Sequence, residues 1–261
     1  MGFIPNSPVL ALSRKWSPLA RYLERRICRP IKIVFAKNYE EVIRSFGKGR
    51  IQIALLGSFA YVKAGKKAKI IPLAQRVRRN TPTYYSVLAV RADSPYKTLA
   101  DLRGKKIAFV DRNSTSGYVV PRLLLARKGI RAPGRYFGKL LWSRNHKNAV
   151  SMVYLKAADA AFFASTYWKP YSKDRKLKDL RLLLRSSDLP LGPFCVPSSM
   201  DPELQEKLKS ALLEISRQNP ATKDLAVQLK ISYFKEVNDR IYDGIRAMDS
   251  ELSSHGLQSG R

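Results

Sequence analysis

Apolar runs alternate with amphipathic segments along most of the chain. Between residues 31 and 110, five apolar runs have the length and the β-branched content that predict strands. The runs are IKIVFA (31–36), IQIALLG (51–57), AKIIPLA (68–74), YYSVLAV (84–90) and KIAFV (106–110). The segments between them have the period of helices. This alternation predicts an α/β fold with a mostly parallel sheet covered by helices.

Local signals place the ends of the predicted helices. Ser17-Pro18 suits an N-cap and first helical position, so the sequence predicts a helix over 17–26. A second helix over 39–49 ends at Gly47 and Gly49. Two later segments have the same character, residues 118–129 and the stretch that follows Asp201-Pro202 up to residue 246.

Length and charge narrow the class of protein. With 261 residues the chain exceeds the usual size of one domain, so we expect two lobes or one large α/β domain. Lys and Arg number 49 against 20 Asp and Glu, a formal charge of +29 that attracts anions. The basic residues are scattered and form no basic helix or arm. We therefore expect a solvated basic surface and no specific nucleic-acid partner.

The sequence contains little that suggests a membrane span, a metal or an enzyme. No stretch of about 18 apolar residues occurs. The N-terminus lacks the charged and apolar regions of a secretory signal, and we expect an export signal to be missing from this chain.

Cys28 and Cys195 could form one disulfide, but nothing indicates that they meet, and Cys195 in PFCV is predicted to be buried.

Catalytic and cofactor motifs are also missing from the sequence. The two His and two Cys never occur at metal-ligand spacing, so no metal site is expected. Walker A, GxGxxG, GxSxG and HExxH motifs do not occur, and the carboxylates form no acid/base pair. The sequence therefore favours a binding protein that uses no cofactor over an enzyme.

The strongest local signal is the segment 106–125, KIAFV-DRN-STSG-YVVPRLLL. A strand ends, a polar loop follows, and a helix begins. Backbone N–H groups at a helix start suit an oxyanion. The hydroxyls of Ser114, Thr115 and Ser116 could add donors, and Gly117 permits a close backbone approach. The alternative is that one hydroxyl merely caps the helix, and local sequence leaves both interpretations open.

Three further side chains are candidate donors. Tyr39 stands at a helix start and Tyr84 opens a strand, although tyrosines at such places are usually half-buried packing residues. His146, in SRNHKNAV, precedes an apolar helix and could be a cap, a donor or a structural histidine. Trp142, Trp168 and Tyr167 are predicted to lie in the core or in a cleft wall.

Several blocks together resemble a known family. They are GFIPNSP (2–8), residues 38–62, residues 84–121 with DRNSTSGYVVP, NHKNAV (145–150) and LPLGPFCVPSSMDPELQEKL (189–208). Their order resembles the phosphate/phosphite/phosphonate-binding (PhnD-like) proteins of ABC transporters, a branch of the type II periplasmic binding proteins. The resemblance implies an α/β fold of two lobes, joined by a hinge of crossover strands, that close over a central ligand cleft.

The resemblance also implies boundaries and ligand contacts. Lobe one would hold residues 1–85 and 189–261, lobe two residues 86–188 with the STSG loop. The hinge would lie near 84–91 and 182–196. The implied ligand-binding residues are Ser114, Thr115, Ser116, Tyr39, Tyr84 and His146, with Gly117 in the loop and Ser58 in a matching loop where packing is an equal alternative.

Two positions depart from the family pattern. Members that bind aminoalkylphosphonates use two carboxylates for the ammonium group, and this chain has Thr166 and Gly192 there. A buried ammonium without a carboxylate is costly, so we expect phosphate, phosphite or a small alkylphosphonate as ligand. An apolar wall could face a short alkyl group, formed by Phe162, Phe163, Trp168 and Phe194.

The expected function is the substrate-binding component of an ABC uptake system. Its partners would be the small oxyanion and the permease, and it would touch the membrane only through the permease or through an unseen anchor. The expected location is the periplasm or the cell envelope. A ligand-sensing module of the same fold, coupled to a receptor or kinase, is the alternative.

Overall fold

The computed structural model describes residues 1–5, 9–168, 179–254 and 256. The chain forms two compact units. Unit 1 comprises Met1–Thr83 and Pro190–Ile245, and unit 2 comprises Tyr84–Leu189 and Arg246–Arg261. The boundaries implied by the resemblance differ mainly at the C-terminal end. Residues from Arg246 onward group with unit 2, where Arg127 donates to the Glu251 carboxylate at 2.8 and 3.2 Å.

Unit 1 contains a six-stranded sheet in the order β13-β4-β12-β3-β1-β2. Strand β1 pairs in parallel with β2 and β3, whereas β12 runs antiparallel to β3 and β4, and β13 antiparallel to β4. The strands are β1 (Gly2–Phe3), β2 (Val34–Phe35), β3 (Ala54–Leu55), β4 (Ile70–Val77), β12 (Pro193–Pro197) and β13 (Tyr233–Glu236).

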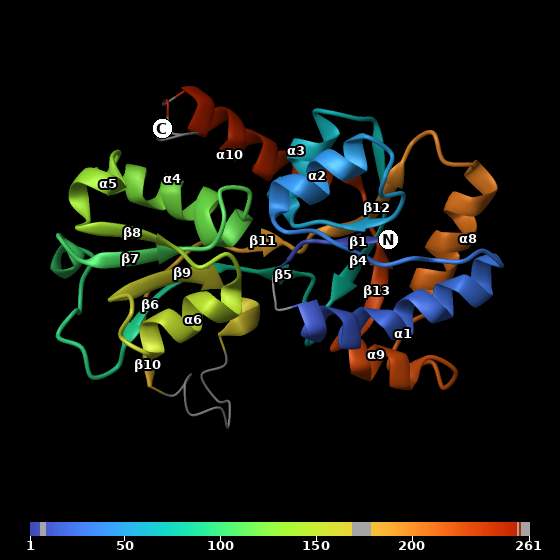
Figure 1. Ribbon diagram of the computed structural model, residues 1–261, viewed down its shortest axis with the longest axis horizontal. Helices are drawn as coiled ribbons and strands as arrows, with labels where there is room; N and C mark the ends of the chain where they lie inside the picture. Colours follow the sequence, from blue (N-terminus) through green and yellow to red (C-terminus); the bar gives the residue numbers. More distant parts are fainter. Residues whose placement is uncertain (6–8, 169–178, 255, 257–261) are drawn as a thin grey trace. The chain divides into compact units, whose positions relative to one another are not determined.

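The core of unit 1 lies between this sheet and the helices that pack on it. Phe3 stacks on Trp16 at 4.7 Å between ring centroids, and Phe194 meets both rings edge-on. Helix α1 packs against α8 and α9 (Figure 1). The helices are α1 (Val9–Ile27), α2 (Tyr39–Gly47), α3 (Ser58–Gly65), α8 (Pro202–Leu213) and α9 (Lys223–Leu229). Cys195 is fully buried, as predicted, and both cysteines are free.

The prediction that a helix starts at Ser17-Pro18 is wrong, because α1 continues through Pro18. Its buried positions run from Leu12 and Trp16 to Leu23 and Ile27 at helical spacing on both sides of the proline. Burial of that continuous apolar face outweighs the backbone hydrogen bond that an interior proline removes.

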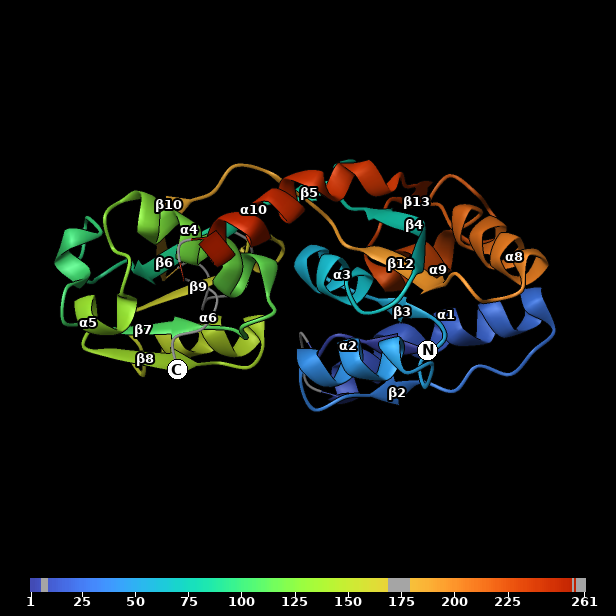
Figure 2. The same cartoon turned by 90° about the horizontal axis from the view of Figure 1, so that it is seen from above.

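Unit 2 contains a five-stranded sheet in the order β10-β6-β9-β7-β8. Strand β6 runs antiparallel to β9 and β10, and β7 runs parallel to β8 and β9. The strands are β6 (Ser86–Arg91), β7 (Lys106–Phe109), β8 (Lys139–Trp142), β9 (Ala160–Ala164) and β10 (Leu180–Arg185). Helices α4 (Val120–Arg127) and α6 (His146–Tyr154) cover opposite faces of this sheet, and α5 (Pro133–Tyr136) precedes β8 (Figures 1 and 2).

Both sheets are mixed, and most of their strands run in one direction, as predicted. Among the described residues, β12 and β13 in unit 1 and β6 in unit 2 run antiparallel to the other strands of their sheets. Strands β5 (Thr83–Tyr84) and β11 (Leu189–Pro190) pair with each other where the sequence passes from one unit to the other. A βα alternation in the sequence does not reveal the antiparallel strands.

Several predicted elements are shorter in the structure. The runs 31–36 and 51–57 contribute only two-residue strands, and the predicted helix 118–129 is a π-helix over Thr115–Val119 followed by α4. A helix starts after Asp201 as predicted, with Asp201 as its cap, and from there the chain forms α8, α9, β13 and α10 (Asp243–Ser254). The basic run 171–178 and most of the polar tail lie outside the described residues. Among the described helices, none is long and apolar enough to cross a membrane.

Candidate oxyanion site

The loop that follows β7 is fixed by its own backbone hydrogen bonds. Ser114 N–H donates to Asp111 O at 2.9 Å, and Asn113 N–H donates to the Asp111 side chain at 2.8 Å. Val110 N–H donates to Gly117 O at 3.0 Å and attaches the loop to the end of the strand. These three hydrogen bonds hold the loop against the end of the strand.

Ser114 caps the helix, so the capping interpretation of this serine is correct. Its Oγ accepts from Gly117 N–H at 3.1 Å. Capping uses an acceptor lone pair, however, and leaves the hydroxyl proton available for donation. Thr115 and Ser116, both buried, follow in the first helical turn, where backbone N–H groups lack acceptors within the helix. A cap and an anion donor are therefore compatible roles for Ser114.

The first turn after the loop is a π-helix. Ser114 O accepts from both Tyr118 N–H at 3.1 Å and Val119 N–H at 3.0 Å. Such single π turns mark one inserted residue and occur often at functional sites. The wider turn is a local feature that periodicity in the sequence did not reveal.

Gly117 is required for packing inside this loop. A Cβ atom at this position would lie 2.5 Å from Val110 Cβ and 2.8 Å from Ser114 Oγ. From the sequence we expected Gly117 to permit the close approach of a ligand to the backbone. In the structure, Val110 lies where the Cβ atom of any other residue would be. Gly117 is therefore needed for the loop to pack against Val110.

The imidazole of His146 is buried and oriented by a backbone hydrogen bond. Its Nδ1 accepts from Ala164 N–H at 3.2 Å, and its ring stacks on Tyr167 with centroids 5.1 Å apart. Burial lowers the pKa of His146 to about 3, so the ring is neutral at physiological pH. Since Nδ1 is an acceptor, the single proton lies on Nε2. His146 is therefore a neutral N–H donor, and Asn145 caps α6 in its place.

One pair of strand residues holds both the loop and the histidine. Ser86, the first residue of β6, lies directly opposite Ala164, the last residue of β9. Ser86 Oγ donates to Ser116 O at 2.7 Å, while Ala164 N–H donates to His146. The hydroxyl loop and the imidazole donor are thereby anchored at the same end of unit 2's sheet. This convergence is the main structural result for the site.

The other predicted residues have simpler environments. Tyr84 is half-buried in β5, and Tyr39 is a buried first residue of α2 in unit 1. Ser58 Oγ donates to Pro190 O, so its hydroxyl proton already has an acceptor. That contact supports the packing role that the sequence left open for Ser58. Trp142 stands 40% exposed at the end of β8, and Tyr167 stacks on His146.

Residues 192 and 166, where this chain lacks the two carboxylates of some family members, differ in how much room they leave for a side chain. A Cβ at residue 192 would lie 2.0 Å from Leu56 O and 2.8 Å from Gly57 C, so only glycine fits. Thr166 is half-buried in a short 3-10 helix.

The proposed apolar wall is contradicted in large part, because Phe162, Phe163 and Phe194 are fully buried core residues. Trp168 alone of that group is half-buried.

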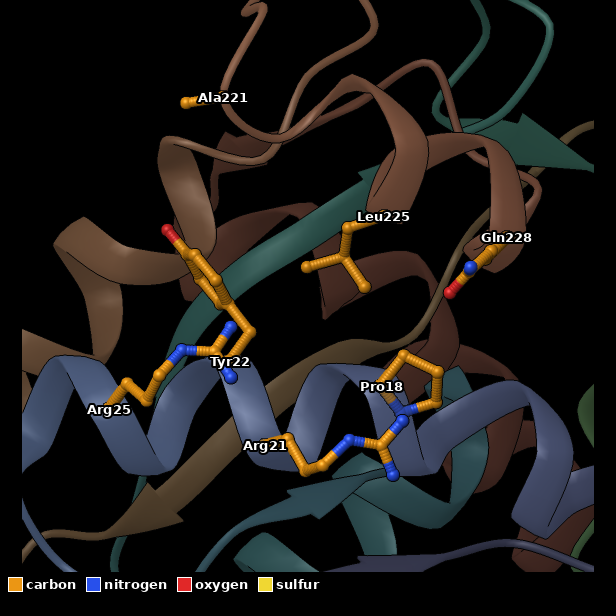
Figure 3. Close-up of a pocket in the computed structure, with 7 residues that line it drawn as sticks. All are labelled: Pro18, Arg21, Tyr22, Arg25, Ala221, Leu225 and Gln228. Atoms are coloured by element: carbon orange, nitrogen blue, oxygen red, sulfur yellow. The ribbon is translucent and has the colours of Figure 1, made fainter.

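A separate cavity of about 210 Å³ lies in unit 1 between α1 and α9 (Figure 3). It contains none of the predicted ligand residues. Tyr22 at its edge donates its hydroxyl to Glu214 at 3.1 Å. The lining residues are Pro18, Arg21, Tyr22, Arg25, Ala221, Leu225 and Gln228.

In the described part of the chain, no cluster of His, Cys, Asp and Glu could hold a metal ion.

A family model described as "ABC transporter, phosphonate, periplasmic substrate-binding protein" matches residues 1–242. The chain belongs to this family. The family assignment, the two-lobe type II fold and the expectation of a binding protein that is not an enzyme are thus confirmed. Family members are periplasmic substrate-binding proteins of ABC import systems for phosphonate or phosphate.

Relatives with similar sequences include two curated proteins. The phosphate-import protein PhnD of Mycolicibacterium smegmatis is 28% identical over 219 residues, 79% of this chain and 68% of that protein. The phosphonates-binding periplasmic protein of Escherichia coli is 24% identical over the whole chain and 78% of that protein.

Solved structures share the fold. A binding protein component of an ABC phosphonate transporter from Pseudomonas aeruginosa has a TM-score of 0.90 and 23% identity, and covers 100% of this chain and 88% of that one. PhnD1 from Prochlorococcus marinus, in complex with methylphosphonate, has a TM-score of 0.87 and 19% identity, and covers 97% of both chains.

Proposed function

We propose that this protein binds phosphate, phosphite or a simple alkylphosphonate at the Ser114–Ser116 loop and delivers it to an ABC permease. The carrying observation is the convergence of that loop and His146 on the Ser86–Ala164 pair. Hydroxyls, helix-start N–H groups and a neutral imidazole N–H are all donors, which suits the unprotonated oxygen atoms of such an anion.

The remaining predicted residues have different proposed roles. Tyr39 and Tyr84 are proposed as additional hydroxyl donors, and the resemblance to the family is what supports them. Ser58 and Gly117 are proposed to shape the site, since Ser58 already donates to Pro190 O and Gly117 packs on Val110. The names of relatives support the ligand class, because one is a phosphate-import protein and another was solved with methylphosphonate.

Loss of the loop hydroxyls is expected to weaken binding without unfolding the protein. Ser114→Ala or Ser116→Ala should raise the Kd for the best ligand by about 10- to 100-fold, since a hydrogen bond to a charged group contributes about 1.5–3 kcal/mol. Isothermal titration calorimetry with phosphate, phosphite and methylphosphonate measures this. Thermal-shift screening with the same ligands is an independent readout.

The control for these variants separates capping from binding. Ser114→Ala also removes a helix cap, which costs about 1 kcal/mol of stability. Asp201→Ala removes the equivalent cap of α8, where Asp201 accepts from Leu204 N–H at 2.8 Å. We expect similar apo destabilisation in both variants and unchanged affinity only in Asp201→Ala. Full affinity in Ser114→Ala and Ser116→Ala together would place the site elsewhere.

The ammonium group of an aminoalkylphosphonate is expected to impair binding. Residue 192 has no room for a side chain and residue 166 is a threonine, so neither supplies a carboxylate. Ethylphosphonate should therefore bind at least tenfold more tightly than 2-aminoethylphosphonate, which differs only by the ammonium group. Competition calorimetry compares the two ligands directly, and tighter binding of 2-aminoethylphosphonate would contradict this ligand assignment.

A further inference from the structure

A buried arginine directly follows the ligand loop. Arg122 lies in α4 and is only 7% exposed. Its Nη2 donates to Arg131 O at 3.3 Å. Its Nε and Nη1 atoms are buried and have no hydrogen-bond acceptor among the described residues. An arginine carries five N–H donors, so most of the donor capacity of Arg122 is unused.

A second cation, Arg112, lies close to Arg122. Tyr118, one turn before Arg122, packs on Trp142 with ring centroids 5.3 Å apart. The guanidinium of Arg112 stands 5.3 Å above the Trp142 ring. Burial lowers the pKa of Arg122, Tyr118 raises it, and the positive charge of Arg112 lowers it further. Arg122 hydrogen-bonds to one member of the aromatic pair, Tyr118, and Arg112 lies over the ring of the other, Trp142.

This arrangement costs stability in the absence of a ligand. A buried charge without an opposite charge is unfavourable, and within the described parts of the chain Arg122 forms no ion pair. Side chains in helices lean toward the N-terminus, which brings the Arg122 side chain over the turn that contains Tyr118. That turn belongs to the π-helix capped by Ser114. Through its contact with Tyr118, the charge of Arg122 is therefore next to the first turn after the loop where the oxyanion is proposed to bind.

We propose that the bound oxyanion is the counter-charge of Arg122, and that Arg122 with Arg112 makes the site select dianionic over monoanionic ligands. This inference rests on the proposed function. Neutral donors such as serine hydroxyls and the His146 N–H discriminate weakly between one negative charge and two. A fixed positive charge in a region of low dielectric discriminates strongly, because its attraction scales with the charge of the ligand. Arg122 attracts the ligand through its positive charge and does not need to contact it.

The test compares two ligands of one shape and different charge. Methylphosphonate above its second ionisation is a dianion, whereas methanesulfonate is a monoanion at every accessible pH. Calorimetry of the full chain should show that Arg122→Met weakens methylphosphonate binding by about tenfold and methanesulfonate binding by less than threefold. Urea unfolding without ligand should show that Arg122→Met is as stable as the wild type or more stable, since an unpaired buried charge has been removed.

Three further variants define the outcome. Arg127→Met removes an arginine from the same helix that pairs with Glu251, and should leave both affinities within twofold. Arg122→Lys keeps the charge and should retain most of the preference for the dianion. Arg112→Gln should reduce that preference to a smaller extent than Arg122→Met.

Each result bears on one claim. If Arg122→Met binds methylphosphonate like the wild type while Ser114→Ala has lost it, this inference is wrong and the proposed function stands. Failure of Arg122→Met to fold would also overturn the inference, because the charge would then be a structural requirement. If the wild type binds no phosphorus oxyanion, the proposed function itself fails.

Discussion

Replacing Gly192 by Asp is expected to lower the free energy of unfolding by about 4 kcal/mol or more. A Cβ at this position would lie 2.0 Å from Leu56 O, and 2.8 Å from both Leu56 C and Gly57 C. These atoms are backbone, so no side-chain rotation relieves the overlap. Equilibrium urea denaturation of the variant at neutral pH measures the loss.

A matched glycine provides the control. Gly244 lies in α10 with nothing within 4 Å of an added Cβ, so Gly244→Ala should be neutral or stabilising. An unchanged unfolding midpoint in Gly192→Asp would show that the Leu56–Gly57 backbone can move. If it cannot, a single substitution at residue 192 will not create a carboxylate for an ammonium group, and a change of ligand class would require backbone rearrangement first.

Stability is expected to fall as the pH drops below 6.5 because of His146. Burial lowers the pKa of His146 to about 3, below the unfolded value of roughly 6.5. The unfolded state therefore takes up the proton first, and stability is complete above about pH 6.5 and lost progressively toward pH 3. At roughly 1.36 kcal/mol per pH unit the loss is about 2 kcal/mol at pH 5. Urea denaturation at pH 7.5 and pH 5 gives the difference.

The two histidines of the chain allow a clean comparison. His146→Gln should remove most of the pH dependence between 7.5 and 5, and His255→Gln should preserve it. The reverse pattern would mean that the burial of His146 does not govern acid stability. Because His146 stays neutral down to about pH 3, ligand affinity should not follow its titration in this range.

The sequence predicted the family and the fold class because those depend on ordered local blocks. The segment DRNSTSG after an apolar run required no knowledge of distant contacts. The predicted helix start at Asp201-Pro202 and the buried Cys195 also follow from local pattern, and the structure confirms both. The start at Ser17 was wrong because a local capping signal was weaker than the apolar face that continues past Pro18.

Other parts of the site depend on contacts between residues far apart in the chain. The pairing of Ser86 with Ala164, which fixes both the loop and His146, is a matter of strand register. The steric requirement at Gly192 arises from Leu56, more than a hundred residues away in the sequence. Burial of Arg122 is equally invisible in a basic chain where most arginines are expected on the surface. No motif signalled these three features.

The π-helix at Thr115–Val119 has a consequence for how insertions and deletions would act here. Each residue of an α-helix advances the chain by about 100° around the axis. The extra residue therefore sets the rotational phase of all of α4, including the side chains of Val120, Arg122, Leu123 and Leu125 that are buried. Removing one residue from this turn would restore a regular helix and rotate the whole buried stripe out of alignment. The loop and the helix behind it can thus change length only together.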